Sequence, residues 1–180
     1  MNIPNALTIF RILLIPVLVF ILLSRFTGRE LLGFAVFVLA AATDLIDGYL
    51  AKKKSQVTAF GQHLDPIADK LLVSSAFICF AGLKTVPVWM VIIIIGREIF
   101  VTGLRAAIYS KVSEFPSFNL GKIKTWFEAI TICALILGEE ILGNFYIIAR
   151  VGLWLVIAFA VTSTIEYYFR FSSLLLSKDS

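Results

Sequence analysis

Cysteine and histidine are almost absent from this chain of 180 residues, which contains two cysteines and one histidine. A zinc site built from thiolates or imidazoles is therefore not expected. Cys79 and Cys133 lie inside apolar blocks, and their spacing supports neither a disulfide nor a metal site. We expect both to be small core residues. His63 lies in a polar connector, where we expect no metal role either.

Internal repeats, low-complexity segments and interdomain linkers are also missing. The length is about that of one domain, so residues 1–180 are expected to form a single domain. The first apolar block lacks a small-residue cleavage site, and Ser24, Arg25 and Phe26 follow it instead, which argues against a cleavable signal peptide. The net charge is a modest +4, and we expect no nucleic-acid partner.

Apolar residues are present in excess. They make up 59% of the chain, whereas ordinary soluble domains contain roughly 45–50%. The excess is concentrated in six nearly uncharged blocks, and each approaches the ~20 residues that a helix needs to span a bilayer once weakly polar neighbours are added. The sequence therefore predicts an all-α integral membrane protein with six transmembrane helices. The blocks are Ile12–Leu23, Leu31–Ala42, Leu71–Leu83, Val86–Ile95, Ile130–Gly138 and Val151–Val161.

The lysines and arginines indicate how these helices are oriented. If the N-terminus is cytoplasmic and the helices alternate, most of the basic loop residues fall on the cytoplasmic side. This bias predicts that both termini are cytoplasmic, and it brings the basic loops to anionic lipid head groups. The helices are expected over about residues 4–23, 31–51, 61–83, 87–109, 119–138 and from 145 past 170.

Four aspartates lie near the predicted cytoplasmic ends of the second and third helices. A charged side chain inside a membrane-spanning helix is unfavourable in free energy. Asp44 and Asp47 are three residues apart, and Asp65 and Asp69 are four apart, so each pair shares one face of its helix. A short connector makes the two helices antiparallel neighbours, so the two pairs can face each other. Four clustered carboxylates repel one another and resist desolvation unless something compensates them.

Two forms of compensation are open. One is an ion-pair network with Lys52, Lys70 and more distant arginines. The other, which we favour, is a divalent-cation site, because all-oxygen ligands suit Mg²⁺, Mn²⁺ or Ca²⁺. Four carboxylates are enough for two metal ions. Gly48, Gly61 and Ala51 alternate with the aspartates, and such small residues let a ligand approach the backbone, although close helix packing uses them too.

This spacing resembles the signature of the CDP-alcohol phosphatidyltransferases, which reads D-x2-D-G-x2-A-R, about eight residues, and then G-x3-D-x3-D. Seven of its eight fixed positions match over 26 residues. The exception is Lys52, where the family usually carries arginine. Lysine keeps the charge but loses the two-pronged hydrogen bonding of a guanidinium group. Similar families have a comparable length and six transmembrane helices.

The resemblance implies a metal-dependent enzyme that transfers a phosphatidyl group from CDP-diacylglycerol to a small alcohol. It implies metal ligands at Asp44, Asp47 and Asp65, and it gives Asp69 two roles, as a metal ligand and as the catalytic general base. The cofactor would be Mg²⁺ or Mn²⁺, two ions per active site. The resemblance also implies a homodimer among membrane lipids in the cell membrane, with its active site near the cytoplasmic face.

The N-terminal stretch from Pro4 to Arg11 resembles the opening of the glycerol-phosphate branch of this family, where it contributes to the nucleotide end of the site. Asn5, Thr8 and Arg11 share one helical face. A simple helix start with a snorkelling arginine is the alternative. The residues assigned to CDP-lipid binding are Asn5, Thr8, Arg11, Gly48, Ala51, Lys52 and Gly61.

Two further segments resemble patterns of that branch, R-E-x6-R ending at Arg105 and G-K-x-K-T over residues 121–125. A phosphorylated acceptor needs a basic pocket, and Arg105, Lys122 and Lys124 are predicted to form it. For the two lysines, ordinary cytoplasmic flanking charges are the alternative.

Arg97 and Glu98 belong to the first of these patterns, and Arg97 falls inside an apolar run. Because the two residues are adjacent, we expect their side chains to point different ways. Arg97 is expected either to pair with Glu128 or Glu166, or to contact substrate.

Taken together, these segments favour sn-glycerol 3-phosphate as the acceptor and phosphatidylglycerophosphate as the product. A sibling enzyme that uses inositol phosphate, serine or another alcohol is the nearest alternative. A cation transporter whose acidic cluster binds metal in transit belongs to a different class, but transporters are often built from paired repeats, and this sequence shows none.

Overall fold

The computed structural model of the chain describes residues 3–54, 59–109 and 119–176, and within these ranges it is helical, with no strand. Side chains are described over residues 6–43, 64, 66–104, 124–166 and 168–169. The elements are α1 (Ile3–Leu23), α2 (Arg29–Lys54), α3 (Ala59–Gly82), α4 (Val88–Tyr109), α5 (Asn119–Leu142), the short 3₁₀ helix η1 (Gly143–Tyr146) and α6 (Ile147–Leu176).

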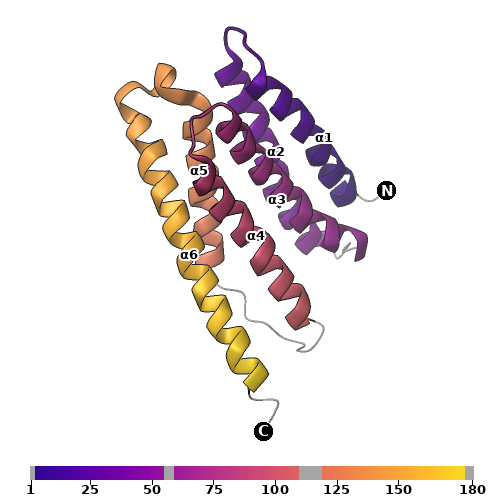
Figure 1. Cartoon of the computed structure of the whole chain (residues 1–180). Coiled ribbons are helices and arrows are strands. Elements are labelled where there is room, and N and C mark those ends of the chain that lie inside the picture. Colours follow the sequence, from indigo (N-terminus) through magenta and orange to yellow (C-terminus); the bar gives the residue numbers. More distant parts are fainter. Residues whose placement is uncertain (1–2, 55–58, 110–118, 177–180) are drawn as a thin grey trace.

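The helices run up and down in an elongated bundle (Figure 1). α1, α3 and α5 begin at the end where α2, α4 and α6 finish, and the three short turns lie together at the opposite end. We call the first of these the motif end, because the aspartates of α2 and α3 and the basic positions of α4 and α5 all belong to it.

Packing joins the helices in two groups. α1 packs against α2 and α3, whereas α6 packs against α4 and α5. Contacts of α5 with α2 and α3, and of α3 with α4, join the groups. The core between them is apolar and rich in aromatic residues. Its largest fully buried members include Phe37, Phe77, Phe80, Leu18 and Ile132.

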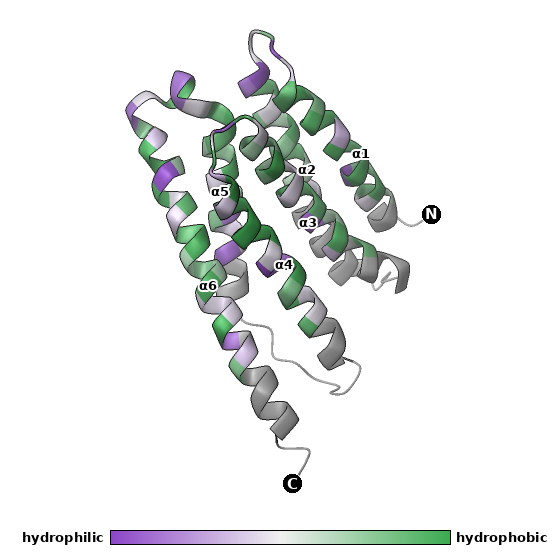
Figure 2. Ribbon diagram, in the orientation of Figure 1, coloured by the Kyte–Doolittle hydropathy of each residue, from purple (hydrophilic) through white to green (hydrophobic). Residues whose placement is uncertain are grey.

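The outer surface of the bundle is also apolar. Figure 2 shows in green how far hydrophobic residues predominate along the helices. Large hydrophobic side chains such as Phe20, Ile99 and Phe145 are about 70% exposed (72%, 69% and 69%). In contrast, several polar side chains are buried, among them Arg11 and Lys124. Apolar surface of this extent marks contact with a membrane or a partner, and polar groups inside with apolar groups outside is the distribution expected in lipid.

The turns explain where the helices stop. Gly28 has φ 87° in the turn before α2, a conformation that glycine adopts without steric cost. Lys84, after α3, has φ 60°, and the backbone N–H of Thr85 donates to the carbonyl of Phe80 at 3.0 Å, which closes the end of that helix. Gly138 interrupts α5 with φ 67° and ψ 179°, and this break falls where the sequence predicted that the fifth helix ends.

The all-helical fold is confirmed, and the described residues form six α-helices with boundaries near those predicted. That all six cross a membrane stays a prediction. In that part of the chain, two stretches are long and apolar enough to cross a membrane, Ala6–Leu23 and Lys124–Glu166, the latter running from α5 into α6. Cys79 and Cys133 are unbridged and lie in or against the core, as expected. His63 lies outside the described side chains.

Candidate active site

The aspartates belong to α2 and α3, which contact each other, and all four lie in the halves of these helices nearer the motif end. Asp69 is half-buried on α3 and has polar contacts. Asp44, Asp47 and Asp65 occupy helical positions, but their side chains lie outside the described set, as do those of the CDP-lipid candidates Asn5, Gly48, Ala51, Lys52 and Gly61. Among the described side chains, no group of three metal-ligating residues occurs.

A divalent cation fits the chemistry of this donor set. The candidate ligands are carboxylate oxygens from two helices in contact, and Mg²⁺ and Mn²⁺ prefer oxygen ligands. The assignment of individual aspartates to the metal remains a prediction.

Arg11 is fully buried on α1 and reaches across to α2, just before the first aspartate. Its Nε donates to the hydroxyl of Thr43 at 3.2 Å and to the carbonyl of Ala40 at 3.3 Å. The Thr43 hydroxyl in turn donates to the same carbonyl at 2.6 Å. Thr8, one turn before Arg11, is also buried. These contacts fix α1 against the segment of α2 that leads into Asp44, and Thr43 is a residue that sequence reasoning missed.

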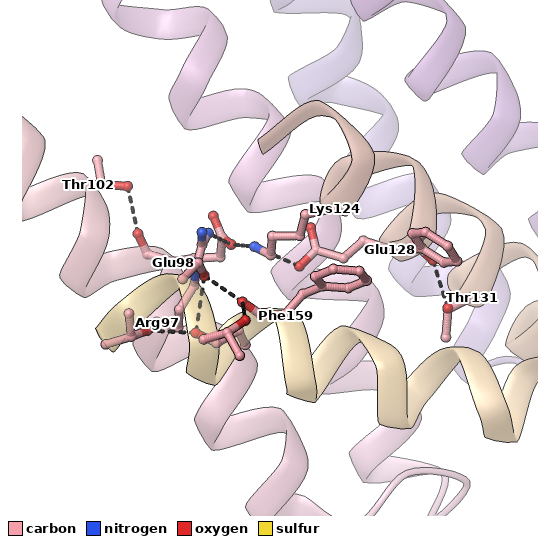
Figure 3. A network of polar contacts seen from close by, with 12 residues as sticks. Arg97, Glu98, Thr102, Lys124, Glu128, Thr131 and Phe159 are labelled. Carbon is pink, nitrogen blue, oxygen red and sulfur yellow. Dashed lines mark hydrogen bonds and ion pairs between the residues drawn. The ribbon is translucent and has the colours of Figure 1, made fainter. Parts of the chain in front are cut away.

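Four charged side chains from α4 and α5 meet inside the bundle, and we term them the buried ion cluster (Figure 3). Lys124 lies between two carboxylates: its Nζ pairs with Oε1 of Glu98 across the helix interface, and with Oε1 of Glu128 at 2.9 Å one turn along α5. Arg97 Nη1 lies 2.5 Å from the same Glu98 oxygen. The side chains are 6–13% exposed.

A third helix joins this cluster. Arg97 Nε donates to the hydroxyl of Ser163 on α6 at 3.0 Å, and that hydroxyl donates to the Phe159 carbonyl at 2.6 Å. The Phe127 and Phe159 rings pack beside it, with centroids 5.5 Å apart. α4, α5 and α6 are therefore tied together by polar contacts and by an adjoining aromatic pair.

The cluster corrects one expectation. The adjacent residues Arg97 and Glu98 were expected to point different ways, yet their side chains form an ion pair. Both side chains are long enough to do so while Glu98 also contacts Lys124 and Arg97 also contacts Ser163. Glu128 pairs with Lys124, and its spacing of four residues was the available signal for that pair. No local pattern pointed to Ser163.

Of the three predicted acceptor-binding cations, the structure describes the side chain of one. The side chains of Arg105 and Lys122 lie outside the described set, although both positions are helical and belong to the motif end. Lys124 is described, and its ammonium group has the two glutamate partners given above. That any of the three binds the acceptor phosphate remains a prediction.

The arrangement gathers the candidate residues of five helices at one end of the bundle. Carboxylates lie on α2 and α3, a buried arginine adjoins them from α1, and cationic positions lie on α4 and α5. Such a set can bind a metal–diphosphate group on one side and an anionic second substrate on the other.

Comparison with known proteins gives consistent matches along the chain. A family model described as CDP-alcohol phosphatidyltransferase matches residues 1–164. A Bacillus subtilis protein named CDP-diacylglycerol–glycerol-3-phosphate 3-phosphatidyltransferase is 41% identical, and the match covers 93% of each chain. A Rickettsia typhi protein of the same name is 36% identical over 93% of this chain and 95% of its own. A third, from Cereibacter sphaeroides, is 38% identical over 84% of this chain and 70% of its own.

Proposed function

The chain belongs to the CDP-alcohol phosphatidyltransferase family, and from this membership we propose that it transfers a phosphatidyl group from CDP-diacylglycerol to sn-glycerol 3-phosphate. The products are CMP and phosphatidylglycerophosphate. The observation that carries the proposal is the 41% identity, over 93% of both chains, to a relative named for this reaction. The match to the family model, over residues 1–164, extends through α4 and α5, which bear the predicted acceptor residues.

In the proposed reaction, a hydroxyl oxygen of the acceptor attacks the phosphorus that carries diacylglycerol. The bond from this phosphorus to the bridging oxygen breaks, and CMP leaves with the electron pair. Asp69 accepts the proton of the attacking hydroxyl. Metal ions held by Asp44, Asp47, Asp65 and Asp69 would supply positive charge where the diphosphate develops negative charge.

The two substrates are proposed to bind on different helices. The nucleotide end lies among residues of α1, α2 and α3, and the fully buried Arg11 supports a role there in holding α1 against α2. The acceptor phosphate is proposed to contact Arg105 on α4 and Lys122 on α5. The charge of Lys124 is already matched by Glu98 and Glu128.

We further propose that all six helices of this single domain cross the cell membrane, with both termini in the cytoplasm, and that the enzyme works as a homodimer. The apolar outer surface, the six α-helices of the described residues and their up-and-down arrangement support the topology. The Lys/Arg bias of the loops supports the orientation.

The test is an assay of CMP release by the purified protein in detergent–lipid micelles containing CDP-diacylglycerol. We expect release to require both Mg²⁺ or Mn²⁺ and sn-glycerol 3-phosphate, to stop with EDTA, and to resume when metal is restored. A panel with serine, inositol and inositol phosphate is the control for the acceptor. Faster turnover with another acceptor would contradict the proposal, and metal uptake by vesicles without CMP release would favour a transporter.

A further inference from the structure

The buried ion cluster carries no net charge. Its two cations, Arg97 and Lys124, match its two anions, Glu98 and Glu128. Arg97 forms an ion pair with Glu98, and Lys124 forms one with each glutamate. A dianionic phosphate that approached Lys124 would meet two carboxylates beside it. Repulsion between like charges at such distances is strong away from water, so Lys124 is poorly suited to bind the acceptor phosphate directly.

The cluster nevertheless lies on the helices that bear the proposed acceptor residues. Glu98 and Arg105 are seven residues apart on α4, which places both positions on one face, two turns from each other. Lys124 belongs to the first turns of α5, close after Lys122. Lys124 joins Glu98 across the α4–α5 interface, and Arg97 joins α4 to Ser163 of α6. The contacts therefore set the rotation and height of α4 relative to α5.

We propose that Lys124 is a positioning residue and not a phosphate ligand: with Glu98, Glu128 and Arg97 it fixes the middle of α4 against the first turns of α5 so that positions 105 and 122 meet the acceptor. This inference rests on the proposed function and deepens it. Removing one member leaves an uncompensated buried charge, which distorts the helix pair. Removing a cation and an anion together keeps the cluster neutral and the helices in place.

The experiment compares Lys124→Met, Glu128→Gln and the double variant Lys124→Met/Glu128→Gln, with Glu139→Gln as the control at an exposed carboxylate of α5. For each purified protein, KM is measured separately for sn-glycerol 3-phosphate and CDP-diacylglycerol. We expect each single variant to raise the acceptor KM about tenfold. The double variant should return to within about threefold of the wild type, and KM for CDP-diacylglycerol should change little throughout.

A direct phosphate ligand would behave differently. The double variant would then keep the whole defect of Lys124→Met, because the cation is still missing, and Glu128→Gln would be harmless or would lower the acceptor KM. Either result overturns the inference. Equal loss for both substrates, or no change in any variant, also overturns it, since the first indicates general structural damage and the second an irrelevant cluster.

Two complications have a defined interpretation, a variant that does not fold and a wild type that uses another acceptor. If Lys124→Met does not fold, the neutral double variant decides alone, because an acceptor KM raised tenfold or more would contradict positioning. If the wild type proves to use another phosphorylated acceptor, the proposed function fails, and the same variants are compared with that acceptor. The wild-type panel and the variant series therefore fail independently.

Discussion

Buried charge is stabilised in two ways in this protein. Arg11 donates hydrogen bonds to a threonine hydroxyl and a backbone carbonyl, whereas Lys124 is held by two carboxylates. In both cases the charged group joins two helices. A residue that ties helices together and a residue that binds substrate can thus look alike in sequence, and only substitutions with a selective readout separate them.

The first prediction at this scale concerns three aspartates. Asp44→Ala, Asp47→Ala and Asp65→Ala should each lower the rate of CMP release at least about a hundred-fold, because metal charge is lost where the leaving group becomes negative. The assay is done at saturating metal. Glu140→Ala is the control, because Glu140 is an exposed carboxylate near the last residue of α5, at the end of that helix away from the motif end. Near-normal rates in any two of the three variants would overturn the assignment.

Asp69 should behave differently from these ligands. As the base it acts on the alcohol, so Asp69→Asn should lower kcat by roughly 10²- to 10⁴-fold. Most of the affinity for CDP-diacylglycerol should remain. The measurement pairs single-turnover rates with equilibrium binding of the CDP-lipid. A collapse of affinity with a high residual rate would show that Asp69 is chiefly a binding ligand.

Arg105 and Lys122 test the acceptor pocket. A charge-assisted hydrogen bond to a dianionic phosphate contributes roughly 1.5–3 kcal/mol, which corresponds to about a ten- to hundred-fold change in binding. Arg105→Ala and Lys122→Ala should therefore raise KM for sn-glycerol 3-phosphate by this factor, with little change for CDP-diacylglycerol. Unchanged values for both substrates would mean that the two residues are ordinary flanking charges.

At the scale of elements, close helix packing depends on small residues at particular positions. Gly152 of α6 is buried against Thr131 of α5, and a Cβ added at Gly152 would overlap the threonine side chain. The Thr131 hydroxyl donates to the Phe127 carbonyl at 2.7 Å, so moving the side chain away would break a hydrogen bond. The fit between α5 and α6 therefore depends on the missing side chain.

Gly152→Ala is expected to lower the thermal stability of the purified protein. Overpacking of this kind costs about 1–3 kcal/mol, which is measurable as a lower Tm in detergent. Gly103→Ala is the matched control, because a Cβ there would meet open space. Adding Thr131→Ala to Gly152→Ala should restore much of the loss. A Tm equal to that of the wild type in the single variant would contradict the packing described here.

At the scale of the whole molecule, the apolar exterior and the alternating helices support the proposed topology, in which the two ends of the bundle face different compartments. Thr27, just before α2, and Asn144, in η1, are exposed in the connections opposite the motif end. The motif end, with its basic residues, is the end expected in the cytoplasm.

Thiol labelling tests this topology. In a chain whose native cysteines are replaced, Thr27→Cys and Asn144→Cys should react with a membrane-impermeant maleimide in spheroplasts. Ser180→Cys should react only after permeabilisation, because the C-terminus is predicted to be cytoplasmic. Reaction of Ser180→Cys in sealed spheroplasts would contradict the orientation, and equal labelling of all three sites after permeabilisation is the necessary control.

Local pattern was sufficient to predict the six helices and the aspartate motif. Apolar blocks with their weakly polar neighbours, bounded by polar connectors, predict where each helix runs, and the break at Gly138 falls at the predicted end of the fifth helix. Spacing places paired aspartates on helix faces. The family follows from the same residues, and the match over residues 1–164 confirms it.

Only the tertiary structure decided which side chains meet between helices. The pairing of Lys124 with Glu98, the bond from Arg97 to Ser163 and the contact of Arg11 with Thr43 each join different helices. Such contacts depend on the rotation and height of one helix against another. Those quantities are set by the packing of the whole core, in which close-fitting residues such as Gly152 and Thr131 take part, and the spacing of residues within a single helix does not contain them.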